Sequence, residues 1–225
     1  MPSPVIITVD GGAASGKSST SRLIADRFNL LHVDTGSHYR AITYSLLKQG
    51  IRADDLDGIR RHLEHLPLGT EVSGHRALIR INNYLPHETE LRSEIVNQHV
   101  SPFAAVPDIR QYLLNYQRSQ ADTAVNHQFK GLIIEGRDVG SVIFPDAPIR
   151  LFLDADAATR AARRAQEGQN DAIEQRDKID SGRKTAPLKC PEGAIRIDSS
   201  NLTLAEVVAK VAAIIENQTG LIARS

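Results

Sequence analysis

The feature that most constrains the fold is a glycine-rich segment near the start of the chain, with the sequence Gly11-Gly12-Ala13-Ala14-Ser15-Gly16-Lys17-Ser18. It matches the phosphate-binding loop pattern, in which glycine and four further residues precede Gly-Lys-Ser/Thr. Small residues let the backbone curl until successive amide groups point at one anion, and the following helix adds the positive end of its dipole. An apolar strand is predicted at residues 5–9, before the loop, and an amphipathic helix at 17–28, after it. We therefore expect a strand–loop–helix unit that binds nucleotide phosphates.

The rest of the chain repeats this alternation of strands and helices. Short apolar runs predict buried strands at residues 31–33, 132–134, 149–153 and 194–197. A helical pattern follows at 203–216, where Thr203 and Glu206 have the spacing of a capping box. Such alternation is typical of a doubly wound sheet with right-handed crossovers. The predicted fold class is α/β, a P-loop NTPase-type three-layer α/β/α sandwich around a central parallel sheet.

Two segments interrupt the alternation. Residues 50–127 contain helical patterns at 54–65 and 108–120 and one β-like run at 77–81, and we interpret them as an insertion between two core strands. Residues 166–186 are almost wholly polar, so we expect them to bury little and to form a short, mobile lid. The chain is then a single P-loop domain whose core comprises residues 1–49, 128–165 and 187–225.

Composition excludes several classes of protein. The 27 basic and 27 acidic residues give no net charge, whereas proteins that coat nucleic acids carry a large basic excess. No run approaches the roughly 20 apolar residues of a membrane span, and no basic region precedes the first apolar residues. Cys190 is the only cysteine, so no intrachain disulfide can form. We expect a soluble, cytoplasmic monomer that binds neither membranes nor nucleic-acid polymers.

The loop alone does not identify the second substrate. GTPases read guanine with an Asn-Lys-x-Asp run, which the chain lacks, and motor-type ATPases usually end a strand with Asp where this chain has Glu135. Arginine is the side chain best suited to grip phosphate, and Arg40, Arg110, Arg137 and a pair in the lid fall in four motifs. These positions predict a site for a phosphorylated acceptor near the loop.

Other residues leave two interpretations open. Arg160, Arg163 and Arg164 share a helical face, which either meets ATP phosphates or is a solvated basic face. Asp34 ends a predicted strand and either holds a Mg²⁺-bound water or serves in a turn or N-cap.

From about residue 5 to about residue 215, the chain resembles the bacterial cytidylate kinases, which are nucleoside monophosphate kinases acting on CMP and dCMP. The order of the motifs matches as well as their content. The resemblance is carried by Asp10-Gly11, Thr35-Gly36, Tyr39-Arg40, Gly136-Arg137-Asp138, residues 142–148, Arg176-Asp177 with Asp180 and Arg183, residues 186–188, and Asp198-Ser199.

The resemblance implies ATP with Mg²⁺ as phosphate donor and CMP or dCMP as acceptor. It also implies that residues 50–127 are the insertion that binds the acceptor nucleotide. It places ATP on Gly11, Gly12, Ala13, Ala14, Ser15, Gly16, Lys17, Ser18 and Ser19, with Ser18 on the metal. It assigns the acceptor phosphate to Arg40 and Arg137, the base to Thr35, Ser101, Arg110 and Asp138, and the sugar to Arg176 and Asp180. It also places Tyr39 in the CMP site and assigns the transferring phosphate to Lys17, Arg137, Arg176 and Arg183. The alternatives are a kinase of the same architecture acting on UMP, shikimate or dephospho-coenzyme A, or a nucleotide-sensing ATP-binding module.

The loop lysine gives the first testable expectation. Lys17 is predicted to neutralise charge on the transferring phosphate, so Lys17→Ala should lower turnover by about two or more orders of magnitude while the fold survives. Steady-state kinetics with a circular-dichroism melt measure both effects. A folded Lys17→Ala variant with a near-normal rate would contradict the assignment.

Overall fold

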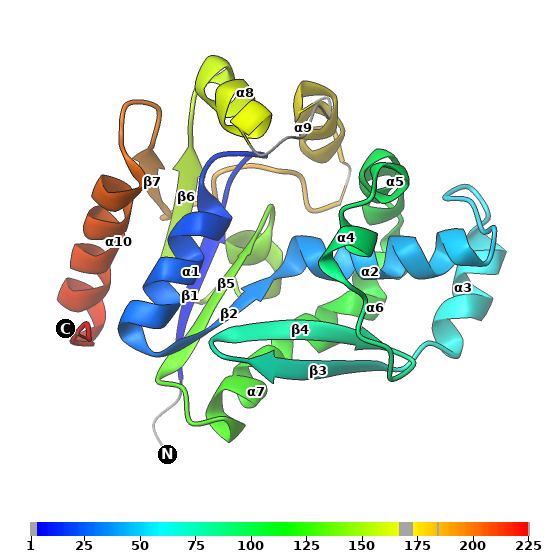
Figure 1. Cartoon of the computed structure of the whole chain (residues 1–225), viewed down its shortest axis with the longest axis horizontal. Helices are drawn as coiled ribbons and strands as arrows, with labels where there is room; N and C mark the ends of the chain where they lie inside the picture. The colour runs from blue at the N-terminus through cyan, green and yellow to red at the C-terminus, as the bar shows by residue number, and fades with distance from the viewer. Residues whose placement is uncertain (1–3, 167–172, 184, 225) are drawn as a thin grey trace.

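The computed structural model describes residues 4–166, 173–183 and 185–224 of the chain, and the side chains of the second range from residue 177 onward. A seven-stranded sheet runs through the centre and carries helices on both faces (Figure 1). The strands lie in the order β3-β4-β2-β5-β1-β6-β7. They are β1 Val5–Asp10, β2 Leu30–Asp34, β3 Leu68–Ser73, β4 Arg76–Ile81, β5 Gly131–Gly136, β6 Ile149–Asp154 and β7 Ile195–Asp198. All neighbours pair in parallel except β3, which is antiparallel to β4 at the sheet edge.

The helices connect these strands and cover the two faces of the sheet. They are α1 Lys17–Phe28, α2 Thr35–Lys48, α3 Leu56–Glu64, α4 Glu88–Leu91, α5 Glu94–Ala104, α6 Pro107–Arg118, α7 Gln120–Asn126, α8 Ala157–Gln166, α9 Ile173–Ser181 and α10 Leu204–Thr219. A π-helical turn, η1 Val139–Ile143, directly follows β5. Among the described residues, no helix combines the length and the apolar run that crossing a bilayer needs.

The core is built on both faces of the central strands. On one face, α1 and α10 bury residues such as Phe28 and Val211 against Ile7 and Ile133. The opposite face of β2 and β5 packs against α7 and η1. Strands buried on both sides explain the near-continuous apolar runs in the sequence. This packing fixes the carboxyl ends of β1, β2 and β5 at one edge, where the polar residues that end each strand are held side by side.

Most elements match their sequence predictions. The strands at 5–9, 31–33, 132–134, 149–153 and 194–197 and the helix at 17–28 are confirmed, and the capping box of Thr203 and Glu206 is formed. The β-like run at 77–81 is β4, which pairs with β2 in the central sheet. Strand β3 and helix α2 had no sequence prediction. Helix α2 begins with Thr-Gly-Ser-His, which favours helix weakly, but its apolar face packs against α3, α5 and α6.

The predicted lid at 166–186 lies partly outside the described residues. Within the described part, α9 carries Asp180, whose side chain is only 5% exposed because it pairs with two arginines. The expectation that this segment buries little is therefore wrong at Asp180. The ion pair with Arg137, which follows β5, links this position to the body of the protein.

The side chain of His38, on α2, is buried without a hydrogen-bond partner among the described residues. His38 is fully buried, and its ring packs edge-on against Tyr116 with the centroids 5.0 Å apart. Among the described residues, neither ring nitrogen of His38 has a hydrogen-bond partner. Burial lowers the pKa of His38 from 6.5 to about 4, although the nearby Asp34 carboxylate acts in the opposite direction. The imidazole is therefore neutral in the folded protein at physiological pH.

This burial predicts an acid-sensitive contribution to stability. The unfolded chain protonates His38 near its ordinary pKa and the folded chain only near pH 4, so the unfolded state binds more protons between these values. The free energy of unfolding should fall by about 2 kcal/mol between pH 7 and pH 5 on account of this group. Urea unfolding of His38→Leu should lose that part of the pH dependence.

The exposed His65 provides a matched control, because His65→Leu removes a histidine that the fold does not bury. His65→Leu should retain the pH dependence of the unsubstituted protein. If His38→Leu and the unsubstituted protein lose the same unfolding free energy between pH 7 and pH 5, the pH dependence does not come from His38.

Candidate active site

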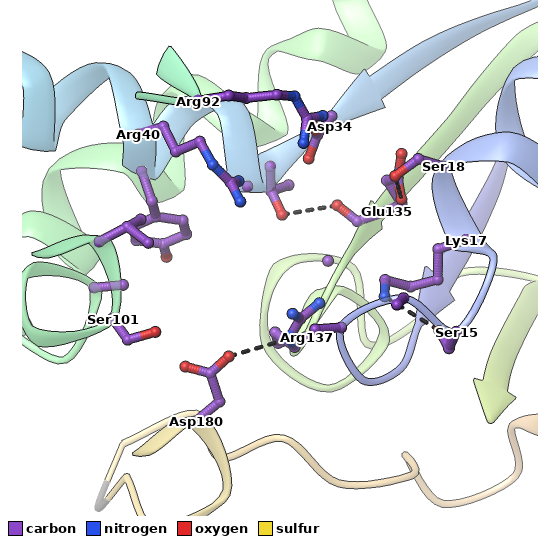
Figure 2. Close-up of a pocket in the computed structure, with 18 of the residues that line it drawn as sticks. Ser15, Lys17, Ser18, Asp34, Arg40, Arg92, Ser101, Glu135, Arg137 and Asp180 are labelled. Atoms are coloured by element: carbon purple, nitrogen blue, oxygen red, sulfur yellow. Dashed lines mark hydrogen bonds and ion pairs between the residues drawn. The ribbon is translucent and has the colours of Figure 1, made fainter. Parts of the chain in front are cut away.

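A cavity of about 410 Å³ opens at the carboxyl ends of β1, β2 and β5 (Figure 2). The glycine-rich loop and the start of α1 form one wall, and α2, α5 and the described part of the lid form the other. Ligands of open α/β sheets bind at this edge, outside the carboxyl ends of the strands. The cavity therefore lies where the sequence predicts the phosphate site.

The loop wall presents backbone amides and one lysine. Gly11 is required by close packing, since a Cβ atom at this position would lie 2.0 Å from the carbonyl oxygen of Leu153. Gly16 occupies the N-cap position of α1 with a φ of 92°, and no described side chain caps this helix end. The amides of the first turn remain available to an anion, and the helix dipole favours one there.

Lys17 lies folded over this loop. Its Nζ donates to the carbonyl oxygen of Gly12 at 2.5 Å and to Oγ of Ser15 at 3.3 Å. Burial and the neighbouring Arg137 guanidinium lower the pKa of Lys17 from 10.5 to about 7, although nearby carboxylates raise it. The ammonium is therefore poorly compensated by the protein itself. A phosphate group bound at the loop would supply the missing negative charge.

The structure brings most of the predicted acceptor residues to the same cavity. Its lining includes Thr35, Tyr39, Arg40, Ser101, Arg137, Asp138, Asp180 and Arg183, and the predicted donor residues from Ala13 to Ser19. Gly11 and Gly12 lie behind the lining, and their carbonyl oxygens accept from Arg137 and Lys17. Arg176 is in α9, but its side chain lies outside the described residues. The guanidinium groups of Arg40 and Arg137 face the space between the two walls (Figure 2).

Arg137 connects the two walls. Its Nη1 donates to the carbonyl oxygen of Gly11 at 3.0 Å, and its Nε donates to Oδ2 of Asp180 at 3.1 Å. The preceding Gly136 is required by a close approach, since a Cβ there would lie 2.4 Å from Oγ1 of Thr35. Thr35 in turn donates to the carbonyl oxygen of Glu135 at 2.7 Å. The start of α2 and the end of β5 are thereby held together.

Arg110 and Asp138 form a buried ion pair next to the cavity. Arg110 Nη2 donates to Asp138 Oδ2, and Arg110 Nη1 donates to the carbonyl oxygen of Ala104 at 3.1 Å. Their side chains are 8% and 4% exposed. Burial raises the pKa of Asp138, and the Arg110 guanidinium opposes this rise. The Tyr39 ring lies 5.3 Å from Arg110, which restricts the pair to one orientation beside the cavity.

Asp10 is a functional position that the sequence analysis noted only as part of a motif. Its two carboxylate oxygens accept from the backbone amides of Val139 and Gly140, each at 2.7 Å. Burial raises the pKa of Asp10 to about 6, against the lowering effect of these two amides. Since η1 directly follows Asp138, this carboxylate fixes the direction in which the end of β5 leaves the sheet. The position of Asp10, at the end of a predicted strand and directly before the loop, is the sequence signal that could have identified it.

The structure gives contacts for the four charged residues whose interpretation the sequence leaves open. Arg160 pairs with Asp177, Arg163 donates to Oγ of Ser199 at 3.0 Å, and Arg164 is buried and lines the cavity. The interpretation as a solvated basic face is therefore wrong, since none of the three is exposed. Asp34 occupies the N-cap position of α2 without capping it.

Asp34 belongs to a charged group at the cavity rim. Burial alone would raise its pKa, but the guanidinium groups of Arg40 and Arg92 outweigh this effect and lower it. Arg92 and Glu88 also line the cavity and pair with each other at 3.0 Å. These two residues lie in a segment without a recognisable motif, so the sequence offered no signal for them.

Glu135, Ser18 and His32 form a second contact chain at the loop. Ser18 Oγ donates to Glu135 Oε2 at 2.9 Å, and His32 Nε2 lies 2.8 Å from Glu135 Oε1. In the described ranges, no cluster of three or more His, Cys, Asp or Glu residues has the arrangement of a metal site. His62, which the sequence places near His65, pairs with Oγ of Ser45 at 2.7 Å.

Two comparisons of the sequence with known proteins point to one family. The family model described as cytidylate kinase matches residues 7–217. A cytidylate kinase of Fusobacterium nucleatum is 37% identical over 215 residues, which cover 91% of this chain and 94% of the relative. A cytidylate kinase of Streptomyces avermitilis is 35% identical over 223 residues, with 95% and 94% covered. A solved sugar kinase from Janibacter sp. superposes with a TM-score of 0.53 at 11% identity, covering 98% and 99%, which shows a shared fold alone.

The lowered pKa of Lys17 predicts proton uptake when a nucleotide binds. At pH 8 the amine is mostly neutral, and a phosphate beside it favours the ammonium, so binding of ADP should take up about 0.9 proton. Calorimetric titrations in buffers of different ionisation enthalpy measure this number. Lys17→Arg is the control, since a guanidinium is charged throughout and should bind without uptake. Binding to the unsubstituted protein without proton uptake would contradict the assignment.

Proposed function

Because the chain belongs to the cytidylate kinase family, we propose that it transfers the γ-phosphate of ATP to CMP or dCMP, giving ADP and CDP or dCDP. An oxygen of the acceptor phosphate forms a bond to the γ-phosphorus, while the bond between that phosphorus and the β–γ bridging oxygen breaks. The observation that carries the proposal is a single cavity with an amide-rich loop on one wall and arginines on the other. Such a transfer is limited mainly by positioning and charge neutralisation.

On the donor side, the loop residues 11–19 would hold ATP, with Lys17 beside its β- and γ-phosphates. The donor set near Ser18 fits Mg²⁺, because the hydroxyl of Ser18 and the carboxylate of Glu135 offer oxygen atoms. Mg²⁺ usually takes one or two protein ligands together with waters and substrate phosphates, so a dedicated acidic cluster is not needed. When bound, the ion neutralises part of the phosphate charge. Ser18 would hold it directly.

On the acceptor side, Arg40 and Arg137 would hold the CMP phosphate in line with the donor. Both line the cavity, and Arg137 is already fixed to the loop through the carbonyl oxygen of Gly11. Asp180 and Arg176 of the lid would meet the sugar, and Arg183 the transferring phosphate. Closure of the lid would exclude water, which would otherwise accept the phosphoryl group. The acceptor phosphate is ionised near neutral pH, so the reaction needs no separate general base.

The base would be read by the buried pair of Arg110 and Asp138, with Thr35, Tyr39 and Ser101 around it. A carboxylate accepts a hydrogen bond from the exocyclic amino group of cytosine, whereas uracil presents a carbonyl oxygen at that place. A site that leaves two acceptors facing each other rejects the wrong base strongly. This chemistry favours CMP and dCMP over UMP. Since all these residues come from one chain, we propose a monomer, and we place it in the cytoplasm with its substrates.

A panel of acceptors tests the proposal. In a coupled assay of ADP release with ATP and Mg²⁺, CMP and dCMP should give the highest kcat/KM, with UMP well behind and with shikimate and dephospho-coenzyme A inactive. The variant Asp138→Asn should lower the ratio of kcat/KM for CMP to kcat/KM for UMP by at least about tenfold, a difference of about 1.4 kcal/mol. The reason is that an amide can donate to the uracil carbonyl.

Asp54→Asn is the matched control, because Asp54 is an exposed carboxylate that pairs with Arg52 on the surface. Asp54→Asn should leave the ratio of kcat/KM for CMP to kcat/KM for UMP unchanged. ATP turnover that is independent of any acceptor would instead support the nucleotide-sensing module and refute the kinase.

A further inference from the structure

A buried histidine on β2 lies behind the loop and has no place in the mechanism described above. His32 is 3% exposed, and its Nε2 lies 2.8 Å from Oε1 of Glu135, which is 2% exposed. The other carboxylate oxygen of Glu135 accepts from Oγ of Ser18 at 2.9 Å. Figure 2 shows Ser18 and Glu135 facing each other beside the cavity. A continuous hydrogen-bonded chain thus runs from β2 through β5 to the first turn of α1.

The sheet register explains why these three residues meet. His32 is paired with Ile133 and Asp34 with Glu135 in the parallel ladder of β2 and β5. Paired residues project from the same face, and residues two apart along a strand share a face. His32 and Glu135 therefore lie on the face that α1 covers. Ser18, in the first turn of α1, therefore lies within hydrogen-bond distance of the Glu135 carboxylate.

The chemistry of the three groups fixes the direction of their protons. An ionised carboxylate only accepts hydrogen bonds, so the imidazole donates from Nε2 and the Ser18 hydroxyl donates its single proton to Glu135. The lone pairs of Ser18 Oγ are then not needed by Glu135 and remain for a cation. A hydroxyl that rotated its proton toward a cation would repel it.

Glu135 also has a competing partner. Lys17 lies close enough for its charge to interact with the Glu135 carboxylate. Without His32, one oxygen of this buried carboxylate would lose its hydrogen bond, which is costly, and rotation toward the ammonium would compensate for the loss. That rotation would release Ser18. The imidazole therefore determines whether the Glu135 carboxylate keeps its hydrogen bond with Ser18 or turns toward Lys17.

We propose that His32 is a positioning residue of the metal and donor-phosphate site, holding Glu135 in the orientation that directs the Ser18 hydroxyl oxygen toward Mg²⁺. The inference rests on the proposed function only in assigning Mg²⁺ to Ser18. Partners that orient metal ligands in this way typically affect metal affinity by about 10- to 100-fold.

The test compares His32→Leu with His32→Gln. Leucine fills similar space without a donor, whereas the glutamine amide nitrogen can occupy the place of Nε2 and donate to Glu135. Electron paramagnetic resonance of Mn²⁺ bound to the complex of protein and ADP measures metal affinity without any turnover. We expect His32→Leu to weaken Mn²⁺ binding roughly 10- to 100-fold, and His32→Gln to restore most of it. The KM for CMP should stay unchanged in both.

His75→Leu is the matched control. This histidine lies in the β3–β4 turn, and its ring contacts Asp26 at 2.9 Å and Asn29 at 3.2 Å, both outside the cavity lining. It should leave Mn²⁺ affinity unchanged. If His32→Leu lowers the melting temperature while Mn²⁺ affinity stays at the unsubstituted value, His32 is structural and the inference is overturned. If the unsubstituted protein binds Mn²⁺ and ADP but does not phosphorylate CMP, the proposed function fails, and the Mn²⁺ comparison still decides the role of His32.

Discussion

The burial of positive charge is the constraint on which the rest of the site depends. A cavity for two phosphorylated molecules needs several cations on facing walls, yet burial and mutual repulsion disfavour them, as the lowered pKa of Lys17 shows. The protein meets this constraint by placing carboxylates between the cations. Asp180 pairs with both Arg137 and Arg183, and Asp34 lies beside the arginines of the rim. The pair of Asp180 with Arg137 also links α9 to the end of β5, so one ion pair both balances charge and positions α9.

The parallel sheet makes this arrangement possible, because it brings strand ends that are distant in sequence to one edge. Val9 and Asp34 both pair with Glu135, and Asp10 pairs with Gly136, so β1, β2 and β5 end at the same level. Each strand then delivers a carboxylate within reach of the loop. The apolar interiors of these strands, buried on both faces, hold the ends rigidly. Core packing therefore sets the positions of the polar groups without contacting the cavity.

The parts that the sequence predicts well are those that depend on local pattern. The loop, the helix after it and the apolar strands follow from residues adjacent in the chain. What the sequence could not predict depends on packing between distant segments. Helix α2 is stabilised by the α3, α5 and α6 contacts in spite of its weak first turn. Likewise, the contact of His32 with Glu135 spans 103 positions and follows only from strand register. The resemblance to a family supplied the acceptor residues, since no single spacing identifies them.

The donor and acceptor halves of the site are not mechanically independent. Gly11 begins the loop, and its carbonyl oxygen accepts from Arg137 at 3.0 Å. The adjacent Asp10 fixes the backbone of Val139 and Gly140, which directly follows Asp138. A shift of the loop would therefore move the groups proposed to hold the acceptor phosphate and the base. Since in-line transfer tolerates little misplacement, tying both halves to two consecutive residues of β1 and the loop keeps their separation constant.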